Sequence, residues 1–142
     1  MPRLTFPLIA GMPLVDLRVS ATLPRQRAAG VPPPPFVTLR ALVDTGAKRT
    51  CVDAAAFRSL GLLPVMKTAV RTASTGRAGM TRDVYDISVA TLGATPVTLA
   101  AAVAAIAIDL SWAPYQCLLG RDVLASCRFM YDGPASRFEL EF

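Results

Sequence analysis

Residues 39–47, which read Leu-Arg-Ala-Leu-Val-Asp-Thr-Gly-Ala, constrain the fold more than any other stretch of this chain. Apolar and β-branched residues favour a buried strand up to Val43, and Gly46 favours a tight bend just after it. Asp44 therefore comes where the chain leaves the core. A carboxylate that is rigidly held, partly desolvated and open to a substrate suits acid–base catalysis. We predict that Asp44 is one half of a catalytic pair of carboxylates.

Length and composition favour one globular domain, which we expect to cover residues 1–142 with a sizeable core. Hydrophobic residues make up 53% of the chain and charged residues only 18%, which argues against disorder and points to a sizeable subunit interface. The net charge of +5 comes mostly from scattered arginines, with no basic run and few aromatic residues to stack on bases. We therefore expect no nucleic-acid partner.

Histidine is absent, which excludes Ser-His-Asp and Cys-His catalysis within the chain, and histidine-ligated zinc sites as well. The three cysteines, Cys51, Cys117 and Cys127, form no CxxC pair, and their odd number argues against a self-contained disulfide framework. We expect them to be buried, reduced thiols of a cytosolic protein. Carboxylates remain the main catalytic candidates, and we expect neither a metal nor a cofactor.

Two apolar stretches resemble targeting or membrane segments only superficially. Residues 1–13 contain one arginine and then apolar residues, but three prolines break any signal-peptide helix. Residues 97–110 are rich in alanine and too short to span a bilayer, so they are better interpreted as buried strand. We expect no membrane insertion and a cytoplasmic location.

The remaining patterns predict a mainly β fold. Alternating or continuous apolar runs predict strands at residues 14–20, 36–43, 65–72, 83–89, 97–101, 103–108 and 116–120. A C-terminal hairpin is predicted from residues 128–131 and 137–142, with a proline that excludes the simplest two-residue turn.

Two short helices and one long loop complete the predicted fold. Residues 52–60 are rich in alanine and are followed by Gly61 and Pro64, which end the helix. Asp122 is placed to cap a second helix. Residues 24–35 end in four prolines, so we expect them to form an exposed loop.

A single carboxylate is a poor hydrolytic catalyst, but two that share one proton divide the chemistry between them. Their repulsion separates the two titrations, so that one acts as a base toward water and the other as an acid toward the carbonyl oxygen. The chain contains no second Asp-Thr-Gly or Asp-Ser-Gly triplet. The simplest source of the second aspartate is another copy of the chain, related by a two-fold axis.

Residues 42–47, Leu-Val-Asp-Thr-Gly-Ala, resemble the active-site signature of retropepsin-like aspartic proteases, the family of the retroviral proteases and their bacterial and cellular relatives. Residues 118–124, Leu-Leu-Gly-Arg-Asp-Val-Leu, are similar to the family's hydrophobic–hydrophobic–glycine element and the helix after it. Residues 70–87 lie where the family carries its flap hairpin. The resemblance extends over residues 14–142 and implies a closed, barrel-like subunit with a flap hairpin and one or two short helices.

The resemblance also implies an activity, that of an aspartic endopeptidase acting as a homodimer on extended peptide or protein substrates. Asp44 would be the catalytic residue, and Thr45 would hydrogen-bond across the two-fold axis. Gly46 would let the substrate backbone approach, while Ala47 supports the active-site loop. The hydrophobic–hydrophobic–glycine element is Leu118, Leu119 and Gly120. The flap residues that would close over the substrate are Ala73, Ser74, Thr75, Gly76 and Arg77.

Several residues depart from the retroviral pattern. Lys48, followed by Arg49, stands where retroviral members commonly have an acid that pairs with the arginine of the Gly-Arg element. A pairing of Lys48 with Arg121 would be repulsive, so Arg121 needs another partner and subsite preferences should differ. The terminal strand at residues 137–142 suggests a dimer edge unlike the viral one.

Other interpretations stay open at this point. In an arbitrary protein, Asp-Thr-Gly is most often a turn or a helix cap. An inactive domain of the same fold that only dimerises or binds peptides is the main alternative to an enzyme. Tyr85 is expected in the core or an interface, and Trp112 either lines a cleft wall or packs under a loop.

Overall fold

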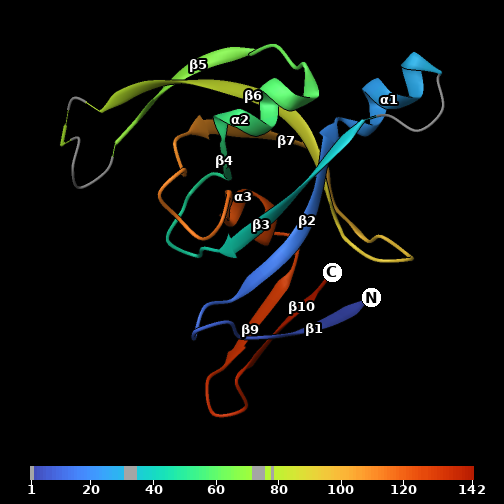
Figure 1. Ribbon diagram of the computed structural model, residues 1–142, viewed down its shortest axis with the longest axis vertical. Helices are drawn as coiled ribbons and strands as arrows, with labels where there is room; N and C mark the ends of the chain where they lie inside the picture. The colour runs from blue at the N-terminus through green and yellow to red at the C-terminus, as the bar shows by residue number, and fades with distance from the viewer. Residues whose placement is uncertain (1, 31–34, 72–75, 78) are drawn as a thin grey trace.

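The computed structural model describes residues 2–30, 35–71, 76–77 and 79–142 (Figure 1). These residues form strands β1 (Arg3–Pro7), β2 (Leu14–Ala21), β3 (Phe36–Val43), β4 (Cys51–Asp53), β5 (Met66–Val70), β6 (Met80–Thr91), β7 (Thr98–Ile108), β8 (Cys117–Leu119), β9 (Arg128–Asp132) and β10 (Arg137–Glu141). Their helices are α1 (Leu23–Ala29), α2 (Ala54–Leu60) and α3 (Arg121–Leu124). The predicted mainly β fold is confirmed.

A closed barrel forms the body of the subunit. Its strands follow the order β2-β3-β8-β4-β7-β6, and β2 pairs again with β6 to complete the ring. Strand β5 pairs with the first part of β6 outside the ring, in the register Met66↔Val84 to Val70↔Met80. Figure 1 shows this β5–β6 hairpin extending from the barrel. Both the closed subunit and the hairpin agree with the sequence prediction.

Alternation along the strands fills the barrel with apolar side chains. Leu17 and Val19 of β2 are fully buried and face the interior with Ile87 of β6. Helix α2 adds Phe57, whose ring stacks on Tyr85 with centroids 4.0 Å apart and an angle of 7° between the rings. Tyr85 is therefore a packing residue, as the sequence suggested.

Strand β8 lies between two strands that follow each other in the chain. It pairs in parallel with β3 through Val43↔Leu119, and antiparallel with β4 through Cys51↔Leu118. A parallel pair cannot be closed by a tight turn, so β8 must be supplied by a distant part of the chain. As a result, the loop after β3 and the turn after β8 meet at the same end of the barrel.

A smaller sheet joins the two ends of the chain in the order β1-β10-β9 (Figure 1). Phe6 of β1 stacks on Phe138 of β10, with ring centroids 5.1 Å apart. The dimer edge that the sequence suggested at residues 137–142 stays a prediction, because it concerns the contact between subunits. Strand β10 is central, because β1, which the sequence did not predict, covers its outer side.

Helix α1 lies where the sequence predicted a loop, so that prediction is wrong for its first part. Thr22 caps the helix by accepting the N–H of Arg25 at 3.4 Å, and Pro24 falls in the first turn, where a missing N–H costs no helical hydrogen bond. Gln26 anchors the helix by donating to the hydroxyls of Ser20 at 2.9 Å and Ser88 at 3.2 Å. Part of the predicted loop, residues 31–34, lies outside the described residues.

The other two helices differ from the predictions in detail. Helix α2 begins after Asp53, which caps it by accepting the N–H of Ala55 at 2.9 Å, and ends at Gly61 with a φ of 64°. Gly120, not Asp122, is the cap residue of α3. The two strands predicted at residues 97–101 and 103–108 are one strand, β7, which begins at Thr98. In the part of the chain that the structure describes, no helix is both long and apolar enough to cross a membrane.

Candidate active site

Asp44 is the first residue after β3 and is half-buried. Its N–H donates to the carbonyl oxygen of Leu119 at 3.0 Å, which extends the β3–β8 pairing by one residue. Its Oδ1 accepts the N–H of Gly46 at 2.9 Å, and its carbonyl oxygen accepts the N–H of Ala47 at 3.2 Å. The strand and the turn therefore hold both the backbone and the carboxylate of Asp44.

Gly120 allows the two loops to meet. A Cβ at this position would lie 2.6 Å from the carbonyl carbon of Arg49 and 2.8 Å from the nitrogen of Thr50, both backbone atoms. Such distances are far shorter than van der Waals contact, so only glycine lets the backbones approach this closely. The glycine of the hydrophobic–hydrophobic–glycine element thus has a steric role beside Asp44's loop.

A network of hydrogen bonds then fastens the loops to each other. The carboxylate of Asp122 accepts the N–H of Thr50 at 2.9 Å and its hydroxyl at 2.7 Å. The Thr50 oxygen in turn accepts the N–H of Gly120 at 3.1 Å. Thr50 and Gly120 are buried, so this network replaces water for the N–H groups of both residues and for the Thr50 hydroxyl. The sequence predicted a helix cap at Asp122 and missed this tie between loops.

Replacing Thr50 with Val should lower the free energy of unfolding by about 1–3 kcal/mol, because the buried N–H of Gly120 loses its acceptor while the side-chain shape is kept. Urea denaturation of both proteins measures the difference. Thr38→Val is the matched control, since Thr38 is exposed on β3, and it should change the stability by no more than about 0.5 kcal/mol. Equal losses in the two variants would contradict the role given to the Thr50 hydroxyl.

Arg121 has the alternative partner that the sequence required. Its Nη1 donates to the carbonyl oxygen of Thr45 at 3.1 Å, and its backbone N–H donates to that of Ala47 at 2.9 Å. The guanidinium therefore binds the active-site loop through a backbone oxygen, without any need for an acid at position 48.

Asp44 faces a cleft of about 430 Å³. Three parts of the chain line this cleft: the active-site loop, the barrel strands that form its floor, and the β5 arm of the hairpin. Among the described residues, the lining consists of Asp44, Gly46, Ala47, Lys48, Arg49, Cys51, Thr68, Ala69, Val70, Arg71, Ile106 and Leu118. The cleft thus lies between the candidate catalytic loop and the base of the predicted flap.

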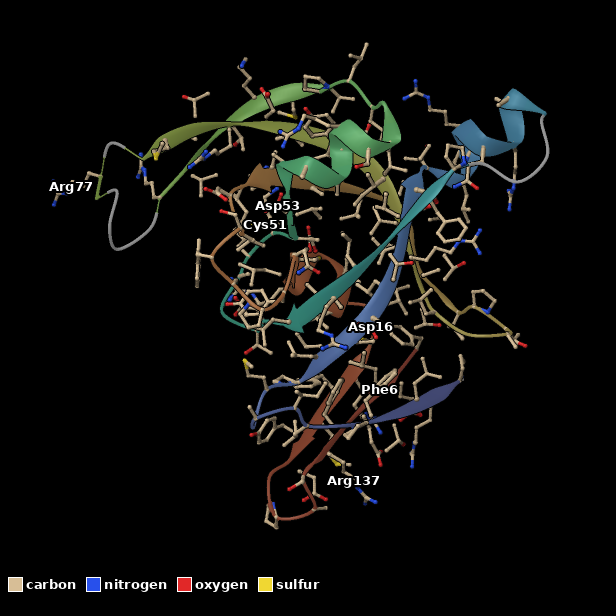
Figure 2. The ribbon with its side chains drawn as sticks, viewed as in Figure 1. Phe6, Asp16, Cys51, Asp53, Arg77 and Arg137 are labelled. Carbon is tan, nitrogen blue, oxygen red and sulfur yellow. The ribbon has the colours of Figure 1, made fainter. Side chains whose placement is uncertain are left out.

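The predicted site residues divide between the cleft and its support. Thr45 is exposed beside the cleft, while Leu119 and Gly120 are buried behind it. Gly76 and Arg77 are exposed and do not line the cleft, and Figure 2 shows Arg77 at the far tip of the hairpin. The other predicted flap residues, Ala73, Ser74 and Thr75, lie outside the described residues.

Sequence reasoning did not assign the cleft-lining role to several residues, namely Arg49, Cys51, Thr68, Ala69, Val70, Arg71 and Ile106. The β5 residues carry no clear alternation of apolar and polar side chains, so the pattern did not indicate which face meets the cleft. The sequence indicated Arg49 only as a basic residue next to Lys48. Trp112 is 74% exposed, meets Tyr115 edge-on with ring centroids 6.5 Å apart, and is not among the described residues that line this cleft.

The cysteine thiols are poor nucleophiles. Burial, with a smaller contribution from Asp122, raises the pKa of Cys51 to about 11, and its thiol donates to the carbonyl oxygen of Arg49 at 3.5 Å. Burial also raises the pKa of Cys117 and Cys127. All three cysteines are free thiols. Because their raised pKa values keep these thiols protonated at neutral pH, Asp44 is the group in the cleft best suited to catalysis.

Comparison with models of known families matches residues 37–126 to the family described as "gag-polyprotein putative aspartyl protease". The matched residues include Asp44, the β5–β6 hairpin and Gly120. A search of curated proteins finds no match.

Two solved structures are similar to this chain. A retropepsin-like aspartic protease from Rickettsia conorii has a TM-score of 0.60 and 16% identity, over 99% of this chain and 91% of that chain. The retroviral protease-like domain of Ddi1 from Leishmania major has a TM-score of 0.42 and 13% identity, over 84% and 82% of the two chains. The first of these similarities supports a retropepsin-like fold.

Proposed function

We propose that this chain, which belongs to the gag-polyprotein aspartyl protease family, is an aspartic endopeptidase that acts as a homodimer. The observation that carries the proposal is the placement of Asp44, held by its own turn and facing a cleft beneath the hairpin. Residues 1–142 would form a single retropepsin-like protease domain.

The chemistry requires a second carboxylate, which Asp44 of the partner subunit supplies across the two-fold axis. One carboxylate is ionised and takes a proton from water, whose oxygen attacks the carbonyl carbon of the peptide. The other is protonated and gives its proton to the carbonyl oxygen. When the tetrahedral intermediate collapses, the carboxyl that took the water proton gives it to the leaving nitrogen and the C–N bond breaks. The other carboxylate takes a proton from a hydroxyl of the intermediate, which becomes the carbonyl of the acid product, so the pair again holds one shared proton.

The proposed dimer agrees with the exposure of the active-site turn. Thr45 and Gly46 are exposed in the isolated subunit, although the residues on either side of them are half-buried. In the dimer, Thr45 would hydrogen-bond to the partner's loop, and Gly46 would border the substrate backbone. The β5–β6 hairpin would hold an extended peptide as an added strand.

Cleavage of a diverse peptide library from mildly acidic to neutral pH tests the activity, and its dependence on protein concentration tests the dimer. Because two subunits build one site, the activity per subunit should rise with the dimer fraction measured by sedimentation. Activity from a sample that sediments as a monomer would contradict the shared site. Peptide binding without cleavage at any pH would instead favour the dimerisation or peptide-binding domain.

A further inference from the structure

The cleft beside Asp44 is strongly basic. Lys48, Arg49 and Arg71 all line it, and Asp44 is the only acid among its described lining residues. Lys48 and Arg49 come from the active-site loop, whereas Arg71 follows the β5 strand of the hairpin. Positive charge therefore reaches the cleft from two separate elements.

Carboxylates elsewhere in the described part of the chain leave these charges unneutralised. The ion pairs found there within 4.0 Å join other residues, for example Asp16 with Arg40, and Asp83 with Lys67. The carboxylate of Asp122 accepts hydrogen bonds from the N–H and the hydroxyl of Thr50. Arg49 has one long hydrogen bond, from Nη2 to the carbonyl oxygen of Ala104 at 3.4 Å, which does not neutralise its charge.

We propose that this cleft selects peptides with acidic side chains next to the scissile bond. The inference rests on the proposed function and specifies its substrate class. Lys48 and Arg71 are exposed in the subunit, so a carboxylate close to either one would form charge-assisted hydrogen bonds that water partly screens. In the dimer, the two-fold axis repeats the same cations on the other side, so acids before and after the bond are both favoured.

The ionised member of the catalytic pair does not reverse this preference. The pair carries one negative charge between two subunits, whereas each subunit alone contributes three cations to the cleft. An incoming peptide therefore meets a net positive field near the reacting bond, and a glutamate there is favoured over a neutral glutamine.

The test compares matched peptides that contain Glu or Gln next to the bond that the library shows to be cleaved. We expect kcat/KM to be about fivefold higher for the Glu peptide, because one partly screened ion pair stabilises a complex by about that factor. Raising the salt from about 0.05 M to about 0.5 M should reduce the ratio. A third peptide with its Glu at the far end controls for attraction by the net charge of +5 and should show no such preference.

Single-residue variants test whether the preference for Glu comes from the cations of the cleft. Lys48→Gln and Arg71→Gln should each lower the Glu-to-Gln ratio, and the double variant should lower it further, with Arg49 supplying the remaining preference. Arg58→Gln removes the same charge from the exposed last turn of α2, outside the cleft, and should leave the ratio unchanged. Equal cleavage of both peptides by the wild type, or an unchanged ratio in the double variant, would overturn the inference.

Binding to the Asp44→Asn protein separates this inference from the proposed function. Stronger binding of the Glu peptide, with a weaker preference when the Lys48→Gln and Arg71→Gln changes are added, supports the basic subsite even if the wild type cleaves no peptide. Cleavage by the wild type without any preference would leave the proposed function standing and overturn the acidic substrate class.

Discussion

Asp44→Asn should abolish peptide cleavage, lowering kcat/KM by at least about a thousandfold. The amide neither accepts a proton from water nor gives one to the carbonyl oxygen at neutral pH, so the paired site loses both functions. Rates on the best library peptide, measured for both proteins at the same concentration, give the ratio. Unchanged cleavage would remove Asp44 from the mechanism.

The fold of the Asp44→Asn variant should be intact, so a difference in cleavage rate between the variant and the wild type reports on the chemistry alone. The Oδ1 of an asparagine still accepts the N–H of Gly46, so the turn keeps the hydrogen bond that orients the side chain. Circular dichroism and the thermal midpoint should therefore match those of the wild type. A large loss of stability would make the variant uninformative about chemistry, and Asp44→Glu, which keeps the charge but displaces it, would then serve in its place.

Mixing the variant with the wild type tests whether the two carboxylates come from different subunits. If subunits exchange freely, a ninefold excess of the Asn variant leaves only about one tenth of the wild-type subunits in wild-type dimers. The activity per wild-type subunit should fall by the same factor. Activity that stays constant under exchange would show that one Asp44 suffices, contrary to the proposed dyad.

The sequence predicted those parts of the fold that depend on local patterns. The strand before Asp44, the turn at Gly46 and the β5–β6 hairpin are short-range features, and each is confirmed. Strand β1 and helix α1 were missed. Pro2 and Pro7 argue locally against a strand, and β1 can be recognised only from its pairing with β10. Pro24 argues locally against a helix, but it lies in the first turn of α1, where proline is tolerated.

The site was predictable only in its central motif. Asp44 and Gly120 could be connected through a resemblance, but the fastening of Thr50 to Asp122 spans 72 positions and has no local signature. Similarly, Arg71 reaches the cleft because β5 pairs with β6 in a particular register. Such contacts follow from tertiary packing, which a pattern of single residues does not encode.

Gly120→Ala should be the most destabilising of the small substitutions near the site. The new methyl group would overlap backbone atoms of Arg49 and Thr50, which cannot rotate away as a side chain would. The loops must separate, and the hydrogen bond from the Gly120 N–H to Thr50 is strained or lost. We expect a loss of about 3 kcal/mol in the free energy of unfolding and a thermal midpoint lower by about 10 °C.

Gly133→Ala is the control for the glycine substitution. A Cβ at Gly133, in the β9–β10 turn, would meet its nearest atom, Cε1 of Tyr131, at 3.4 Å, an ordinary contact. That variant should keep the wild-type stability within about 0.5 kcal/mol. Because the loops that separate in Gly120→Ala also hold Asp44, its remaining folded fraction should cleave more slowly than the wild type. Full activity per folded molecule would show that Asp44 keeps its position without the close contact at Gly120.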